Sequence, residues 1–181
     1  MEAGVINYRG VDILISEDHD PLPPNDCDDD HLFLIYDHRD FTVLKSGFSP
    51  QETFNYLQSI DDGTNVDFQN LYADYHIFPV FAYIHSGVSL SLSGGGCRFD
   101  TSMRGFAFAS KKEWTDKKVA EDIVKSLIET WNQYLSGECY GYEIEEYGDS
   151  CWGYYGEEAL TEAKSIIDWH CKEKQKALLL M

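Results

Sequence analysis

The chain has 181 residues, of which 43% are hydrophobic and 14% aromatic, so it can form a packed core and is not expected to be disordered. Its 32 acidic residues against 14 Lys and Arg give a formal net charge of −18, which argues against direct binding to free DNA or RNA. No apolar run is long enough to span a membrane, and the 5 cysteines form no C-x-x-C pair. We therefore expect a reduced, cytoplasmic protein without a metal or a cofactor.

The first part of the chain predicts a hairpin, a strand and a short helix. Residues 4–15 contain β-forming residues on both sides of Arg9-Gly10, which predicts the turn of the hairpin. Residues 31–36 form a short apolar run and predict a strand. A helix is expected from its N-cap Ser49 to about Ile60, because proline and glutamate follow Ser49 at the spacing typical of a helix start.

Residues 16–30, between the hairpin and the next strand, contain 7 acidic residues and 3 prolines but no Lys or Arg. Prolines and like charges oppose regular pairing, so this segment predicts an exposed acidic loop.

The middle of the chain predicts three strands, at residues 77–84, 88–92 and 105–109. Pro79 lies within the first of them and indicates a sheet edge or a bulge, because proline has no backbone N–H to donate.

Two long helices and two strands are predicted near the C-terminus. Apolar residues recur at helical spacing over about 116–135, and Gly137 follows as a C-cap. Residues 140–144 and 150–155 predict strands, and a final helix is expected over about 157–172.

Together these elements predict a single α+β domain spanning 1–181, with a mostly antiparallel sheet, two long helices and one short helix. Both long helices are expected to pack on one face of that sheet. Trp152 and one tyrosine are expected in the core beneath the last helix, with anchoring of an interface as the alternative for Trp152.

Two acidic clusters are candidates for binding a basic partner protein. The first is in the loop and the second in the predicted strand near residue 144; their members are Asp26, Asp28, Asp29 and Asp30, and Glu143, Glu145 and Glu146. The alternatives are a solvated surface for either cluster and Mg²⁺ binding for the second.

Candidate catalytic residues are His85, Arg98 and Asp100. A histidine could transfer a proton and an arginine could stabilise phosphate charge during cleavage of a phosphodiester. The alternative is that these side chains make structural hydrogen bonds.

Five segments carry a resemblance to a known family: 83–90, 97–100, 105–106, 134–142 and Asp149–Gly156, which reads DSCWGYYG. Over roughly residues 76–158 the chain resembles small acidic proteins encoded by phages and conjugative elements of Gram-positive bacteria. Some proteins of this kind look like anti-CRISPR inhibitors directed at Cas9. The resemblance implies a counter-defence role and supplies no catalytic residue.

The charge and the resemblance lead to one main functional hypothesis. The chain is expected to bind and inhibit a basic nucleic-acid-handling protein, most concretely Cas9 or its guide-RNA complex, in the bacterial cytoplasm. One alternative is a nuclease, or a factor that provokes cleavage of the effector's guide RNA. A second alternative is an unrelated phage protein for host takeover or structure.

Overall fold

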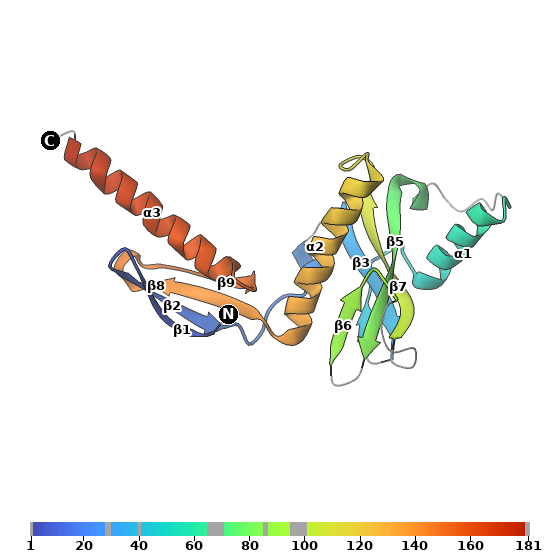
Figure 1. Ribbon diagram of the computed structural model, residues 1–181, viewed down its shortest axis with the longest axis horizontal. Coiled ribbons are helices and arrows are strands. Elements are labelled where there is room, and N and C mark those ends of the chain that lie inside the picture. The colour runs from blue at the N-terminus through green and yellow to red at the C-terminus, as the bar shows by residue number, and fades with distance from the viewer. Residues whose placement is uncertain are drawn as a thin grey trace. The chain divides into compact units, whose positions relative to one another are not determined.

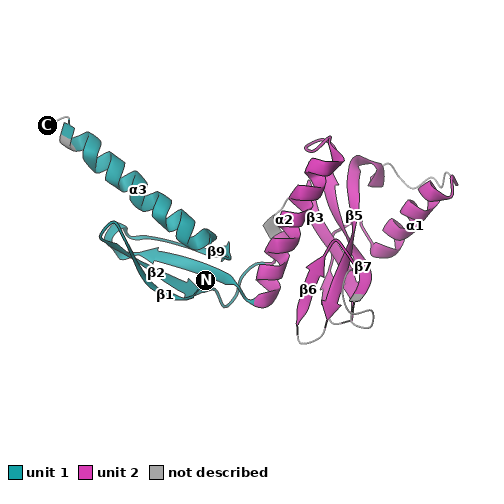
Figure 2. Cartoon of the chain, viewed as in Figure 1, with its two compact units in different colours: residues 1–22, 137–181 teal, residues 23–136 magenta. Residues whose placement is uncertain are grey.

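The chain forms two compact units in the computed structural model, which describes residues 2–27, 30–39, 41–64, 71–84, 87–94 and 101–179 (Figure 1, Figure 2). Unit 1 consists of residues 1–22 and 137–181, and unit 2 of residues 23–136. Both contain antiparallel strands and helices, so the predicted α+β class is confirmed. The boundary at residue 22 falls within the predicted acidic loop. That the whole chain is one domain stays a prediction.

Unit 1 is a four-stranded antiparallel sheet with a long helix packed on one face. Its elements are β1 (Gly4–Tyr8), β2 (Val11–Glu17), β8 (Cys139–Ile144), the 3-10 turn η3 (Glu145–Tyr147), β9 (Asp149–Tyr155) and α3 (Glu158–Leu179). The strand order is β1-β2-β8-β9, so the N-terminal hairpin pairs with a strand from the far end of the sequence. Ala159, Ala163 and Ile167 of α3 are fully buried against the sheet.

The predicted hairpin turn at Arg9-Gly10 is confirmed. Tyr8 pairs with Val11, and the two residues between them have φ values of 53° and 85°. Positive φ at both central residues is the geometry of a type I′ turn, whose twist matches that of the strands. Arg9 is not a glycine, and its Nε lies 2.6 Å from Asp168 of α3, which ties the turn to the helix.

Unit 2 is a five-stranded antiparallel sheet with a helix on each face. Its elements are the 3-10 turn η1 (Pro24–Cys27), β3 (Leu32–His38), β4 (Phe41–Val43), α1 (Pro50–Asp61), the 3-10 turn η2 (Tyr72–Asp74), β5 (Tyr75–Ile84), β6 (Val88–Ser91), β7 (Thr101–Ser110) and α2 (Lys117–Ser136). The strand order is β4-β3-β7-β5-β6.

The alternation of side chains along β7 explains why both faces of the unit 2 sheet are covered. Ala107 and Ala109 point into the cluster that contains Trp131 of α2. Phe106 and Phe108 point into the opposite cluster, where α1 packs. The small residues make room for the bulky helix α2, while the aromatic rings fill the space beneath the shorter α1.

The predictions for the start of α1 and for Pro79 are confirmed. The Ser49 Oγ accepts a hydrogen bond from the Glu52 backbone N–H at 3.2 Å, as an N-cap does. Pro79 lies where β5 pairs with β7 alone, and a register shift follows at Val80/Phe81. The missing backbone N–H of Pro79 therefore removes no hydrogen bond between β5 and β6.

One prediction about the architecture is wrong. The two long helices do not share one face of one sheet: α2 packs on the sheet of unit 2, and α3 packs on the sheet of unit 1. The apolar stripes of both helices were correctly located, but a stripe indicates only that a helix is covered and not which strands cover it.

Candidate acidic docking face

The candidate site is the sheet face of unit 1 that lies opposite α3, called here the open face. Along β2, Val11, Ile13 and Ile15 are buried under α3, so the intervening Asp12 and Leu14 point to the open face. Strand pairing then places Val5, Leu14, Glu143 and Ser150 in one row across all four strands. Gly141 and Trp152 also lie on the open face.

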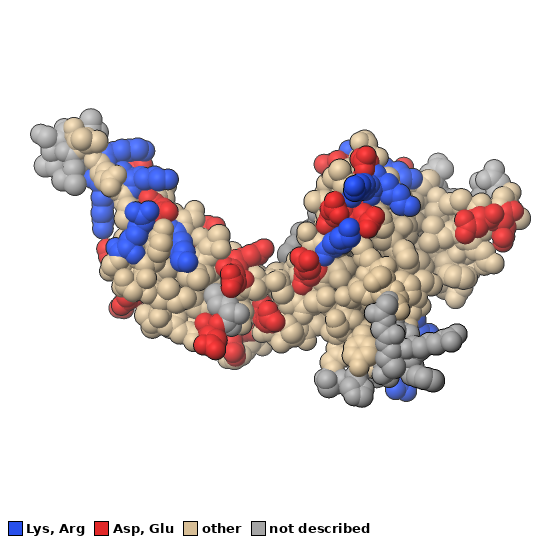
Figure 3. Space-filling model, viewed as in Figure 1, with Lys and Arg blue, Asp and Glu red and all other residues tan. Residues whose placement is uncertain are grey.

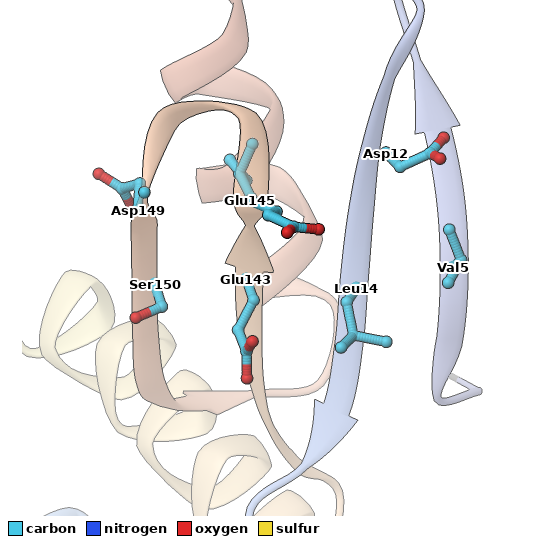
Figure 4. A pocket seen from close by; sticks show the side chains of 9 residues that line it. Val5, Asp12, Leu14, Glu143, Glu145, Asp149 and Ser150 are labelled. Atoms are coloured by element: carbon cyan, nitrogen blue, oxygen red, sulfur yellow. The ribbon is translucent and has the colours of Figure 1, made fainter.

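A pocket of about 590 Å³ is hollowed into this face (Figure 4). Its wall combines apolar and acidic side chains, and among the described residues no Lys or Arg contributes to it; the lining residues are Val5, Asp12, Leu14, Glu143, Ile144, Glu145, Gly148, Asp149 and Ser150. Figure 4 shows the Glu145 carboxylate reaching from the β8–β9 turn toward β2. The pocket therefore presents negative charge beside exposed apolar groups.

Local hydrogen bonds position two of the acids. The Asn7 Nδ2 donates to the Asp12 carboxylate at 2.6 Å, which fixes Asp12 on the hairpin. The Tyr142 hydroxyl donates to the Asp149 carboxylate at 2.8 Å, which holds Asp149 at the pocket rim. Glu143 follows the alternation of β8, and Glu145 is placed by the short turn η3, which Gly148 ends with a φ of 63°.

Positive charge in unit 1 is concentrated away from the open face. All Lys residues of this unit, Lys164, Lys172, Lys174 and Lys176, belong to α3, and Figure 3 shows the blue side chains gathered over that helix. Unit 1 is therefore polarised, with lysines on the helix side and uncompensated carboxylates on the open face.

The structure divides the strand acids that were predicted as a docking patch. Glu143 and Glu145 both line the pocket. Glu146 does not, since its carboxylate lies 3.3 Å from the Nζ of Lys174 on α3. The structure adds Asp12 and Leu14, which the sequence analysis missed. The alternation of residues 11–15 already indicated that both point away from the core, but the pairing of β2 with β8 could not be read from the sequence.

The prediction that Trp152 lies in the core beneath the last helix is wrong. Its side chain is 46% exposed and covers Gly141 on the open face, where a Cβ would collide with the indole ring. Of the two tyrosines that follow Trp152, Tyr154 packs in the cluster beneath α3. Ser150 lies on the open face, so the alternation along β9 places Trp152 there too, and a bulge opposite Tyr140–Tyr142 then puts Tyr154 on the α3 side.

Two tyrosines packed behind the open face, the buried Tyr142 and the partly buried Tyr154, remain protonated at neutral pH. Burial raises the pKa of Tyr142, and its hydrogen bond to Asp149 raises it further. Burial and the neighbouring Cys151 raise the pKa of Tyr154 to about 12. Both hydroxyls therefore act as neutral hydrogen-bonding groups at neutral pH. Among the described residues, no group of three or more His, Cys, Asp and Glu is arranged to hold a metal ion.

The loop acids are only partly covered by the structure. Asp28 and Asp29 lie outside the described residues, and Asp26 belongs to η1, with a side chain that is not described. Asp30 is exposed and lies 2.7 Å from the Nζ of Lys45, which lowers the pKa of its carboxyl group. The charge of Asp30 is therefore partly balanced within unit 2.

The three candidate catalytic residues, His85, Arg98 and Asp100, lie outside the described residues. Their proposed catalytic and structural roles both stay predictions.

No protein-family model, curated protein or solved structure matches the chain. None of its described helices combines the length and the apolar character that crossing a membrane requires.

Proposed function

We propose that this chain is a binding protein whose open face docks on a basic surface of a nucleic-acid-handling protein and inhibits it. The observation that carries the proposal is the pocket lined by Asp12, Glu143 and Glu145, to which the described part of the chain contributes no basic residue. Beside these acids, Val5, Leu14 and Trp152 are 66%, 39% and 46% exposed. Exposed apolar groups supply contact area, and unpaired carboxylates attract Lys and Arg and steer the encounter.

The partner that fits best is a protein with a positively charged nucleic-acid channel. Such channels concentrate Lys and Arg along the path of the phosphate backbone, and an acidic protein can occupy that path in place of the nucleic acid. The resemblance to phage and conjugative-element proteins makes Cas9 or its guide-RNA complex, in the bacterial cytoplasm, the specific candidate.

Charge reversal on the two sides of unit 1 tests this proposal. The variant Glu143→Lys/Glu145→Lys alters the open face, and the control Glu162→Lys/Glu173→Lys makes the same change in net charge on α3. We expect the open-face variant to bind a Cas9–guide complex about tenfold or more weaker, and the control to bind nearly as well as the parent chain. Affinity is measured at about 50 mM and about 300 mM salt, because charge steering weakens with ionic strength.

Equal losses in the two variants would mean that net charge alone matters, and unchanged binding in both would exclude the open face.

The loop acids are tested separately by changing Asp26, Asp28, Asp29 and Asp30 to Asn. We expect weaker binding with an unchanged fold, since like charges so close together in the sequence repel one another.

The guide-RNA hypothesis is separated from simple blocking by a denaturing gel. After incubation with the effector–guide complex, an intact guide together with lost DNA cleavage supports blocking. A shortened guide, restored to full length when a folded His85→Ala variant is used, would support the nuclease alternative.

A further inference from the structure

A second hollow, of about 470 Å³, runs along the solvent side of α3, on the side of unit 1 that lies away from the open face. Its lining residues are Thr161, Lys164, Ser165, Asp168, Trp169 and Lys172. They recur at intervals of three and four residues, so they form one continuous side of the helix.

Two lysines in this hollow form no ion pair among the described residues. Lys164 lies over the ring of Tyr8, with its Nζ 5.6 Å from the ring centroid, and Lys172 has no carboxylate within ion-pair distance in the described part of the chain. The other two lysines of α3, by contrast, each lie within 3.3 Å of a glutamate. The hollow therefore presents two uncompensated positive charges in a chain whose net charge is −18.

The acidic residue that lines the hollow, Asp168, does not cancel these two charges. Its carboxylate lies 2.6 Å from the Nε of Arg9 and accepts a hydrogen bond from the Tyr8 hydroxyl at 3.2 Å, so its own charge is already balanced. Beside it, Trp169 is 59% exposed, and an edge-on contact with His170 at 4.8 Å holds its indole ring. The hollow thus combines free ammonium groups with an exposed aromatic ring.

These features are complementary to the open face. The pocket there is lined by the carboxylates of Glu143 and Glu145 and by the apolar Val5 and Leu14. Ammonium groups attract such carboxylates, and an exposed indole can cover apolar side chains. The two surfaces of one chain cannot meet, because α3 and the open face lie on opposite faces of the same sheet. Contact between them requires two copies of the chain.

We infer that the lysine side of α3 docks on the open face of a second copy of this chain. Lys164 and Lys172 face the carboxylates of that open face, and Trp169 covers its exposed apolar side chains. Because the two surfaces differ, the contact leaves one surface of each kind free, and copies join head to tail. This self-association competes with the basic partner of the proposed function for the open face, but it does not depend on that partner.

Sedimentation of the full chain by analytical ultracentrifugation tests the inference. The chain is measured from about 10 to about 500 μM, with a reducing agent because Cys151 is an exposed free thiol. At about 150 mM NaCl the screening length is about 8 Å, so distant charges of two copies repel one another weakly while contacting groups still attract. We expect the average mass to rise with concentration beyond that of a dimer.

Two charge-reversed variants identify the contact. Lys164→Glu/Lys172→Glu reverses the charge of the hollow, and Glu143→Lys/Glu145→Lys reverses that of the open face. Each variant alone brings like charges together and should self-associate about tenfold or more weaker than the parent chain. In an equimolar mixture, each reversed surface meets the opposite charge on the other variant, so we expect association to return.

A control variant separates the contact from net charge. Lys112→Glu/Lys118→Glu changes two exposed lysines of unit 2 and alters the net charge by the same amount as the change in the hollow. We expect this control to self-associate nearly as well as the parent chain.

A chain that stays monomeric at every concentration, or a mixture that stays monomeric, would overturn the inference. Equal weakening by the hollow variant and the control would also overturn it, since net charge alone would then explain the loss. A uridine oligonucleotide supplies the remaining arm. Its retention by a monomeric parent chain, but not by Lys164→Glu/Lys172→Glu, would assign the two lysines to a phosphate backbone instead. No effector protein is present, so a failure of the proposed function would leave these results unchanged.

Discussion

At the scale of single residues, Gly105 shows how closely the strands of unit 2 approach a neighbouring side chain. It lies in β7, between β3 and β5. A Cβ at this position would lie 2.5 Å from the Ile35 carbonyl oxygen and would also collide with the ring of Tyr36. Neither atom can withdraw easily, because the first belongs to the backbone and the second to a buried side chain.

We therefore expect Gly105→Ala to lower the free energy of unfolding by about 1–3 kcal/mol or more, as overpacking does. Gly87→Ala is the matched control, since a Cβ there meets nothing within 4 Å. Urea denaturation of both variants measures the difference. Equal urea midpoints for the two variants would mean that β7 can move away from β3 at Gly105 without a loss of stability.

The tyrosines packed beneath α3, Tyr142 and Tyr154, make the stability of unit 1 fall at alkaline pH. An unfolded tyrosine loses its proton near pH 10, whereas burial raises the pKa of folded Tyr154 to about 12. Between these values the folded state binds more protons than the unfolded state, so the free energy of unfolding falls as pH rises. The contribution is fully present below about pH 10.

We expect the denaturation midpoint to decline from about pH 10 to about pH 12, and Tyr154→Phe to make that decline shallower. Tyr147→Phe is the control variant, because it also removes one phenol hydroxyl. A decline of the same slope in the parent chain and Tyr154→Phe would assign the alkaline sensitivity to other groups.

At the scale of elements, α3 illustrates how one helix presents a buried side and an exposed side. Ile167 is fully buried against β2 and β8, while Trp169, two residues further on, is 59% exposed. This spacing follows from the helical period, which places residues two apart on different sides.

Ile167→Ala should therefore destabilise the protein by about 2–5 kcal/mol, since it leaves a cavity in the core. Trp169→Ala should change stability by no more than about 0.5 kcal/mol, although it removes the larger side chain. Chemical denaturation of the pair checks the contrast. If Trp169→Ala destabilised the protein more than Ile167→Ala, the side of α3 that carries Trp169 would have to be packed against another surface.

At the scale of the whole molecule, the net charge of −18 opposes the folded state through self-repulsion. Short ion pairs such as Arg9–Asp168 at 2.6 Å act in the other direction, and salt weakens both effects. With so large an excess of acids, repulsion should dominate.

We expect the melting temperature to rise by about 2 °C or more between about 10 mM and about 300 mM NaCl. The Glu143→Lys/Glu145→Lys variant carries less negative charge and should gain less. A melting temperature that falls with salt would instead assign the larger role to ion pairs.

The sequence by itself determined what depends on neighbours along the chain. The Arg9-Gly10 turn, the Ser49 cap, the C-terminal Gly137 of α2 with its φ of 77° and the apolar stripes of the helices were all readable, because turns, caps and periodicity involve only a few consecutive residues. The acidic character was equally evident from composition, so Glu143 and Glu145 could be named as candidates.

The tertiary structure decided which distant segments meet. Pairing of β2 with β8 joins Asp12 and Leu14 to Glu143, although more than a hundred residues separate them in the chain. The β8–β9 bulge places Trp152 and Tyr154 on opposite faces of the sheet, and α2 and α3 pack on separate sheets. An apolar stripe or an alternating strand specifies that a face is buried, but the partner is chosen by the fit of nonlocal surfaces, which no local pattern encodes.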